Sequence, residues 1–193
     1  MSTGTIPHFP LRRKRAHEVC GPGARFFAIA QCASVEGTVL WVRESWQHDV
    51  LNPTGFSAMI DPDRLILANA ADQADGLAIS EEALRSGAVP LVVIELSRPL
   101  SFTAGRRLQL AAKTGKSTAL ILIPEGMGNN AAETRWRCAP IFDAADSTLQ
   151  RWEIIKNKSG TFGVWNVRWN AQTRRLIVVP PVGERPGAQG APG

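Results

Sequence analysis

The segment Gly21–Phe27, which reads GPGARFF, is the part of this chain that comes closest to a motif of known chemistry. It follows Glu18–Cys20, which we expect to be the end of a short strand, and precedes an expected helix. A working phosphate-binding loop has the pattern GxxxxGK[ST]: backbone amides wrap the phosphates, the lysine neutralises their charge and the hydroxyl binds magnesium. Gly21, Pro22 and Gly23 can begin such a turn, but phenylalanines stand where the lysine and the hydroxyl are needed. The segment alone fits either a degenerate nucleotide site or an ordinary strand-turn-helix.

Cysteine and histidine, the usual zinc ligands, are few and widely spaced in this chain. They are Cys20, Cys32, Cys138, His8, His17 and His48. The cysteines form no CxxC pair, and the histidines have no metal-binding spacing. We therefore expect reduced thiols, no disulfide framework and no metal site.

The net charge of +5 is unevenly distributed. Residues 1–15 hold four basic and no acidic side chains, residues 16–134 hold nine basic and thirteen acidic, and residues 135–175 hold eight basic and three acidic. Two basic regions therefore flank an acidic centre. This pattern suits an anionic partner, either DNA or an acidic protein surface, and it also suits a solvated basic face without a partner. The candidate contact residues are Arg12, Arg13, Lys14, Arg15, Arg135, Arg137, Lys156 and Lys158.

Apolar runs alternate with amphipathic stretches through the first two thirds of the chain. Strands are expected at 38–42, 64–67, 91–96 and 119–123, and helices at 24–34, 72–86 and 102–113. Strands that alternate with helices predict a largely parallel sheet covered on both faces. Ligands bind such sheets at the carboxyl ends of the strands, which is where Gly21 lies.

After residue 134 the pattern changes to short strands joined by turns. These strands are expected at 135–140, 150–158, 162–169 and 174–179, antiparallel and added to the same sheet. Tryptophans recur in this region; they suit either stacking on bases or, more often, packing in the core. We expect an α/β fold with a flexible basic arm at 1–15, one domain at 16–179 and a disordered Gly/Pro-rich tail at 180–193.

The segments DPDRL (61–65) and ALRSGAV (83–89), which run into LVVIE (91–95), resemble the bacterial recombinase RecA. The resemblance continues through residues 110–123 and returns in IIKNK (154–158), so it covers about residues 16–175 in the same order. It implies a RecA-like core in which the Gly21 turn is a remnant of a phosphate loop.

Departures from the RecA pattern imply that nucleotide chemistry is lost. The loop has no Lys-Thr pair, and Glu95 stands at the position of the aspartate that serves magnesium. Glu44 falls near the place of the catalytic glutamate, and Arg25 lies too early in the loop to replace its lysine. Lys156 and Lys158 match lysines that reach a neighbouring subunit's nucleotide in RecA filaments, although two exposed strand residues fit equally well. We expect no ATP hydrolysis, no resident cofactor, and at most weak binding of ATP and magnesium.

The short length, the degenerate loop and the late tryptophans are similar to the ImuA family. Further matches are HEV before the Gly21 turn, LWV at 40–42, RLQLAA at 107–112 and TRWR at 134–137. The resemblance implies a non-catalytic accessory factor in SOS-induced mutagenesis and translesion DNA synthesis. Its implied partners are an ImuB-like protein and an error-prone DnaE-type polymerase, with direct DNA contact left open.

Two alternative functions remain open from the sequence. One is a recombinase-type DNA-repair ATPase with an unusual loop, and the other is a cell-division inhibitor similar to SulA, a family also related to RecA. No apolar run approaches the ~20 residues of a membrane span, and no secretory signal is recognised, so we expect a cytoplasmic protein.

Overall fold

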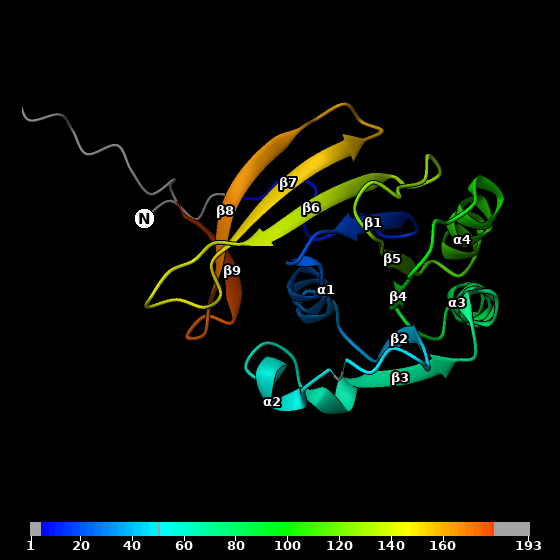
Figure 1. The fold of residues 1–193 in the computed structure, drawn as a ribbon, viewed down its shortest axis with the longest axis horizontal. Helices are drawn as coiled ribbons and strands as arrows, with labels where there is room; N and C mark the ends of the chain where they lie inside the picture. Colours follow the sequence, from blue (N-terminus) through cyan, green and yellow to red (C-terminus); the bar gives the residue numbers. More distant parts are fainter. Residues whose placement is uncertain (1–4, 50, 180–193) are drawn as a thin grey trace, which may run out of the picture.

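A computed structural model describes residues 5–49 and 51–179 of the chain. Nine strands form a single sheet in the order β3-β2-β4-β5-β1-β6-β7-β8-β9 (Figure 1). The pairs from β3 to β6 are parallel, and those from β6 to β9 are antiparallel. The expected α/β class, with a largely parallel sheet extended by antiparallel strands in the C-terminal third, is confirmed. Among the described residues, no helix has the length and apolar character needed to cross a membrane.

The strands are β1 (Ala16–Cys20), β2 (Val39–Glu44), β3 (Leu65–Ala70), β4 (Leu91–Glu95), β5 (Thr118–Leu122), β6 (Thr134–Pro140), β7 (Gln150–Asn157), β8 (Gly163–Asn170) and β9 (Arg175–Val179). The helices are α1 (Ala24–Ala33), α2 (Pro53–Phe56), α3 (Gln73–Ser86) and α4 (Phe102–Thr114), with a 3-10 turn at Pro62–Arg64. The central strands β1, β4 and β5 are buried along their whole length, and in β4 and β5 this burial appears in the sequence as the apolar runs LVVI and ALIL.

Helices cover both faces of the parallel part of the sheet. The α3 and α4 helices pack on each other and on one face, and α1 lies on the other (Figure 1). Side-chain oxygens start both long helices: Asp72 accepts from the amide of Asp75, and Ser101 accepts from that of Ala104. The α3 helix then ends at Gly87, whose φ of 69° is the left-handed conformation that terminates many helices.

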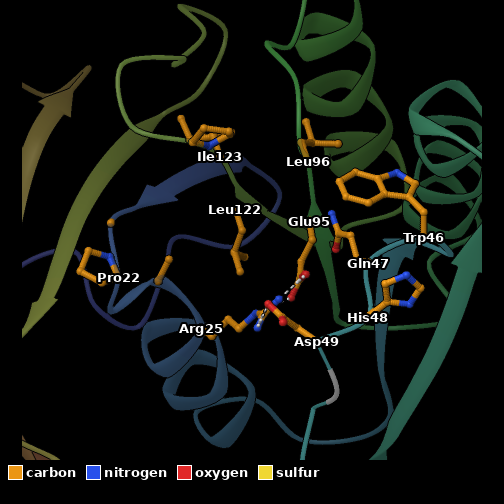
Figure 2. Close-up of a pocket in the computed structure, with 13 residues that line it drawn as sticks. Pro22, Arg25, Trp46, Gln47, His48, Asp49, Glu95, Leu96, Leu122 and Ile123 are labelled. Atoms are coloured by element: carbon orange, nitrogen blue, oxygen red, sulfur yellow. Dashed lines mark hydrogen bonds and ion pairs between the residues drawn. The ribbon is translucent and has the colours of Figure 1, made fainter.

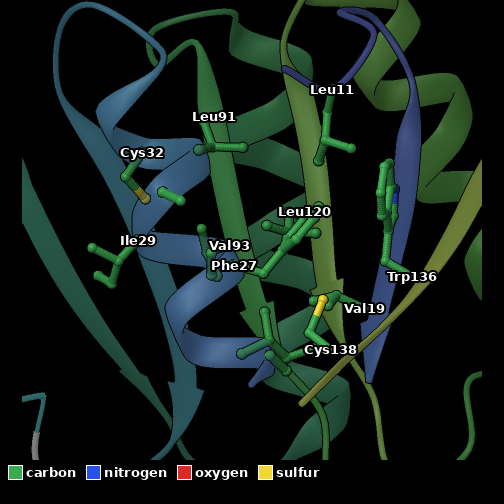
Figure 3. Packing of buried hydrophobic residues seen from close by; sticks show 14 of the residues in the cluster. Leu11, Val19, Phe27, Ile29, Cys32, Leu91, Val93, Leu120, Trp136 and Cys138 are labelled. Atoms are coloured by element: carbon green, nitrogen blue, oxygen red, sulfur yellow. The ribbon is translucent and has the colours of Figure 1, made fainter. Parts of the chain in front are cut away.

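Aromatic side chains fill the core beneath α1. Phe27 points from the helix toward the strands (Figure 3), with its ring centroid 4.6 Å from that of Trp152 and 5.2 Å from that of Trp136. Both tryptophans are fully buried, so they serve the core and are not available to stack on bases. Trp165 and Trp169 are partly buried and pack against the same cluster. Core packing, the more common role of strand tryptophans, therefore applies here.

Burial also determines the state of the three cysteines. All three are free and buried, and burial raises their pKa, for Cys32 to about 12. The thiols are therefore protonated and unreactive at neutral pH.

The N-terminal segment is packed and is not a free arm. Ile6 and Leu11 are buried, and the Phe9 ring lies 5.1 Å from Trp152 between centroids. The Leu11 amide also donates to Gln31 Oε1 on α1 at 2.9 Å. Isolated apolar side chains therefore fasten residues 5–15 to the core, in a segment for which the sequence predicts a flexible basic arm. Residues 1–4 and the predicted tail at 180–193 lie outside the described residues.

Candidate functional site

The turn after β1 is held by the strand beside it. The Gly23 amide donates to the Cys138 carbonyl on β6 at 2.8 Å, and the Ala24 amide donates to the Gly21 carbonyl at 3.0 Å. In a phosphate loop these amides would face the ligand. Here they are used within the protein.

Both glycines of the turn are required by close packing. Gly21 has a φ of 89°, and a Cβ there would lie 2.5 Å from the Cys138 carbonyl oxygen. A Cβ on Gly23 would lie 2.3 Å from Gln150 Oε1. The close contact of the turn with β6 and β7 is therefore sufficient to explain why glycine occupies both positions.

Arg25, on the first turn of α1, forms a two-pronged ion pair with Glu95 at the end of β4. Its Nε donates to Glu95 Oε1 at 3.1 Å and its Nη2 to Oε2 at 3.2 Å, while Nη1 donates to Asp49 Oδ2 at 3.2 Å (Figure 2). The buried Trp41 indole also donates to Glu95 Oε1, at 3.1 Å. Burial lowers the pKa of Arg25, but its bonds to Glu95 and Asp49 outweigh this and raise it overall. Arg25 is therefore a fixed cation with two carboxylate partners.

These residues border an open cavity of about 830 Å³ at the carboxyl ends of the parallel strands. That volume lies in the range of small-molecule sites. The exposed Trp46, His48 and the Asp49 carboxylate line one side (Figure 2). Apolar side chains line the other: Leu96, Leu122, Ile123 and Pro124. The position of the cavity is the one expected for a ligand site in an open α/β sheet, but its walls carry two carboxylates beside the Arg25 charge.

Glu44 lies at the end of β2 and is buried. Its Oε2 accepts from Ser97 Oγ at 2.9 Å and from the Trp46 indole, and Oε1 has no hydrogen-bond partner among the described residues. Glu44 does not line the cavity, whose lining residues come from neighbouring segments. The structure thus brings together Gly21, Pro22, Arg25 and Glu95 and leaves Glu44 beside them, bonded to Ser97 and Trp46.

Three of the basic residues predicted to contact DNA or a partner bond to the protein itself. Arg135 pairs with the fully buried Glu18 at 2.7 Å. Lys156 Nζ donates to carbonyls of the loop at residues 129–132, including Asn130 at 3.0 Å, and Lys158 Nζ donates to Ala131 at 2.8 Å. Burial, followed by the charges of Lys158 and Arg135, lowers the pKa of Lys156. These bonds hold the loop that follows β5.

The other basic candidates remain closer to solvent. Arg12 and Arg15 each lie 3.5 Å from Glu133, and Arg137 lies 3.5 Å from Glu125. Arg13 and Lys14 are exposed.

Sequence reasoning missed Asp49 and Trp41 as partners of the Arg25–Glu95 pair. Trp41 had been assigned to an apolar strand, and its indole N–H gives no signal in a hydrophobic pattern. Asp49 lies in a loop, where spacing is uninformative. Within residues 5–49 and 51–179, no group of three or more histidine, cysteine or acidic side chains is arranged to hold a metal ion.

Comparison with known proteins supports a single family. No protein-family model matches the chain. Protein ImuA of Caulobacter vibrioides, from strains NA1000 / CB15N and ATCC 19089 / CIP 103742 / CB 15, is 30% identical over 155 residues, which is 78% of this chain. The chain spans 58% of the length of these relatives. It is therefore a homologue of Protein ImuA, as expected for a member of the ImuA family.

Proposed function

We propose that this chain is a non-catalytic, RecA-like accessory factor in damage-induced mutagenesis and translesion DNA synthesis. It acts in the cytoplasm with an ImuB-like protein and an error-prone DnaE-type polymerase. Homology to Protein ImuA supports the general role. The partners follow from the sequence resemblance to that family.

The main support for a non-catalytic role is that Arg25 already forms ion pairs with Glu95 and Asp49. A nucleotide phosphate in this cavity would have to displace two carboxylates from Arg25 or accept their repulsion. Charge-assisted hydrogen bonds contribute about 1.5–3 kcal/mol each. Displacement would therefore consume most of the binding energy that a single cation supplies, which supports weak binding of ATP and magnesium at most.

The Gly23 amide supports the same conclusion. Its bond to the Cys138 carbonyl joins the turn to β6, and freeing it would separate the two. A nucleotide would gain the Gly23 amide as a donor only by breaking this backbone bond. This cost is absent from a working phosphate loop, whose amides are free to receive the ligand.

Two measurements test the proposal. Deletion of the gene should lower the frequency of ultraviolet-induced mutation, and wild-type protein should restore it; an unchanged frequency would refute the role. Calorimetry with ATP and magnesium should show no binding tighter than millimolar. Micromolar binding accompanied by release of phosphate from ATP would instead support an ATP-using enzyme.

A pull-down tests the partners separately. Tagged full-length protein should retain the ImuB-like protein and the polymerase from cells exposed to ultraviolet light. Capture of the division tubulin in their place, with slowed tubulin assembly, would support the SulA-like alternative and contradict the proposed partners.

A further inference from the structure

A second cavity lies at the opposite end of β1 from the Gly21 turn. It has a volume of about 240 Å³ and is bordered by the C-terminal half of α4 and by residues just before β1, just before β6 and just after β7. Its floor is fixed, because Gln109 on α4 accepts a hydrogen bond from the Ala16 amide at 2.8 Å. We call this cavity the α4 cleft.

Basic side chains crowd around one carboxylate in the α4 cleft. Glu133 is contacted at 3.5 Å by Arg12, whose side chain is 70% exposed, and at 3.5 Å by Arg15. The remaining basic side chains that line the cleft are Arg106, Lys113 and Lys158. Four basic side chains and one acid thus line the cleft, and Arg12 adds a fifth positive charge through its contact with that acid. The basic residues come from three segments that are distant in the sequence. A charge excess of this kind attracts an anion.

The α4 helix sets the spacing of two of these cations. Arg106 and Lys113 are both exposed and seven residues apart, which is about 10.5 Å at 1.5 Å per residue. At 3.6 residues per turn, the two side chains therefore leave the same face of α4 about two turns apart. Arg107, the neighbour of Arg106, instead pairs with Glu81 on α3 and faces away from this excess.

The cleft is chemically unlike a protein-binding surface. Such surfaces have an apolar centre inside a polar rim. Leu110, which is 50% exposed, is the apolar residue among those that line the α4 cleft. The surrounding guanidinium and ammonium groups suit phosphate oxygens.

We propose that the α4 cleft binds the phosphate backbone of DNA through Arg106 and Lys113, with Arg12, Arg15 and Lys158 adding charge. The proposal deepens the proposed function and rests on it for its biological role. It adds two α4 residues that sequence reasoning did not consider. Arg135 and Lys156 are set aside because they bond inside the protein and do not line the cleft. Lys158 also donates to a carbonyl, that of Ala131, but it lines the cleft and keeps its charge there. Because contacts are to phosphate, we expect little sequence preference and strong dependence on salt.

Fluorescence anisotropy of the full chain with a labelled 20-base-pair duplex, at 50 to 200 mM salt, tests the site. Each phosphate contact contributes about 0.9 to the slope of log affinity against log salt. The double variant Arg106→Ala/Lys113→Ala should therefore flatten the slope by about 1.8. The affinity ratio between wild type and variant should shrink about twelvefold from 50 to 200 mM. Equal charge removal on the antiparallel strands, Arg151→Ala/Arg175→Ala, should leave the slope within 0.3 of wild type, an approximate tolerance for contacts of this size.

Glu133→Gln provides a test by gain of binding, which misfolding cannot imitate. Removing this carboxylate frees Arg12 and Arg15, so the duplex should bind more tightly and with a steeper salt dependence. Unchanged binding in Glu133→Gln, or equal loss in the two double variants, would overturn the proposal.

The mutation assay separates failure of this site from failure of the proposed function. If the α4 variants bind DNA normally but deletion still lowers ultraviolet-induced mutation, the site is wrong and the function stands. If the variants lose DNA binding but deletion has no effect on mutation, the site stands and the function is wrong.

Discussion

Replacing Arg25 by methionine tests whether its ion pair with Glu95 is structural. The change leaves a carboxylate that is only 6% exposed with the Trp41 indole as its remaining donor of those described. Breaking a buried ion pair costs about 3–5 kcal/mol. The Arg25 side chain is 41% exposed, so solvent screens the pair and we take about half, ~2 kcal/mol. For a chain of this size that free energy lowers the melting temperature by about 4–8 °C.

Urea unfolding followed by tryptophan fluorescence measures this free energy. In the double variant Arg25→Met/Glu95→Gln, the amide still accepts from Trp41 but carries no charge, so most of the ~2 kcal/mol should return. Arg168→Met is a matched control, because that arginine is 48% exposed and lies 3.9 Å from Asp146, a partner 21% exposed. It should cost no more than about 0.5 kcal/mol. A loss of less than about 0.5 kcal/mol in Arg25→Met would refute a structural role for the Arg25–Glu95 pair. So would a double variant whose loss equals the sum of the losses in the two single variants.

Three further outcomes follow from contacts described above. His17 is buried, and burial lowers its pKa to about 4, so the unfolded chain binds a proton at higher pH than the folded chain does. The free energy of unfolding should therefore fall by about 3 kcal/mol as the pH falls from 6.5 to 4. The variant His17→Gln should not show this loss. Gly21→Ala should cost about 2–3 kcal/mol in thermal unfolding, and Gly126→Ala, with a φ of 78° and no atom within 4 Å, about 1–2 kcal/mol. Lys156→Met should cost about 1 kcal/mol and speed hydrogen exchange at residues 129–132 without weakening DNA binding; preserved exchange would contradict its role in holding that loop.

The alternation of strands and helices was predictable because the central strands are buried on both faces. LVVI and ALIL are apolar throughout, and each predicted strand matches an observed one to within a residue or two. The antiparallel strands were also located correctly, since turns separate them. Helix ends were marked by Gly87 and Gly115, which the sequence shows directly.

Contacts between distant segments explain what could not be predicted. Phe9 lies between prolines and has no periodic neighbours, so its packing on Trp152 leaves no pattern in the sequence. The charge of Lys156 suggests solvent or DNA, but its position beside the 129–132 loop directs it to backbone carbonyls. Conversely, Arg106 appears in the sequence as an ordinary exposed helix residue. Its part in the α4 cleft depends on how α4 lies against β1 and β5.

The position of β1 between β5 and β6 has a consequence for synthesis on the ribosome. Both neighbours of β1 are encoded about a hundred residues later. Synthesis proceeds at about 5–20 residues per second, so β1 is made roughly 5–20 seconds before its neighbouring strands. Trp152, which packs on Phe27, is made later still. During that interval the aromatic face of α1 lacks Trp136 and Trp152, the aromatic partners of Phe27 on β6 and β7. Nascent chains stalled before residue 134 should therefore be targets for chaperones, and release past residue 152 should end that dependence.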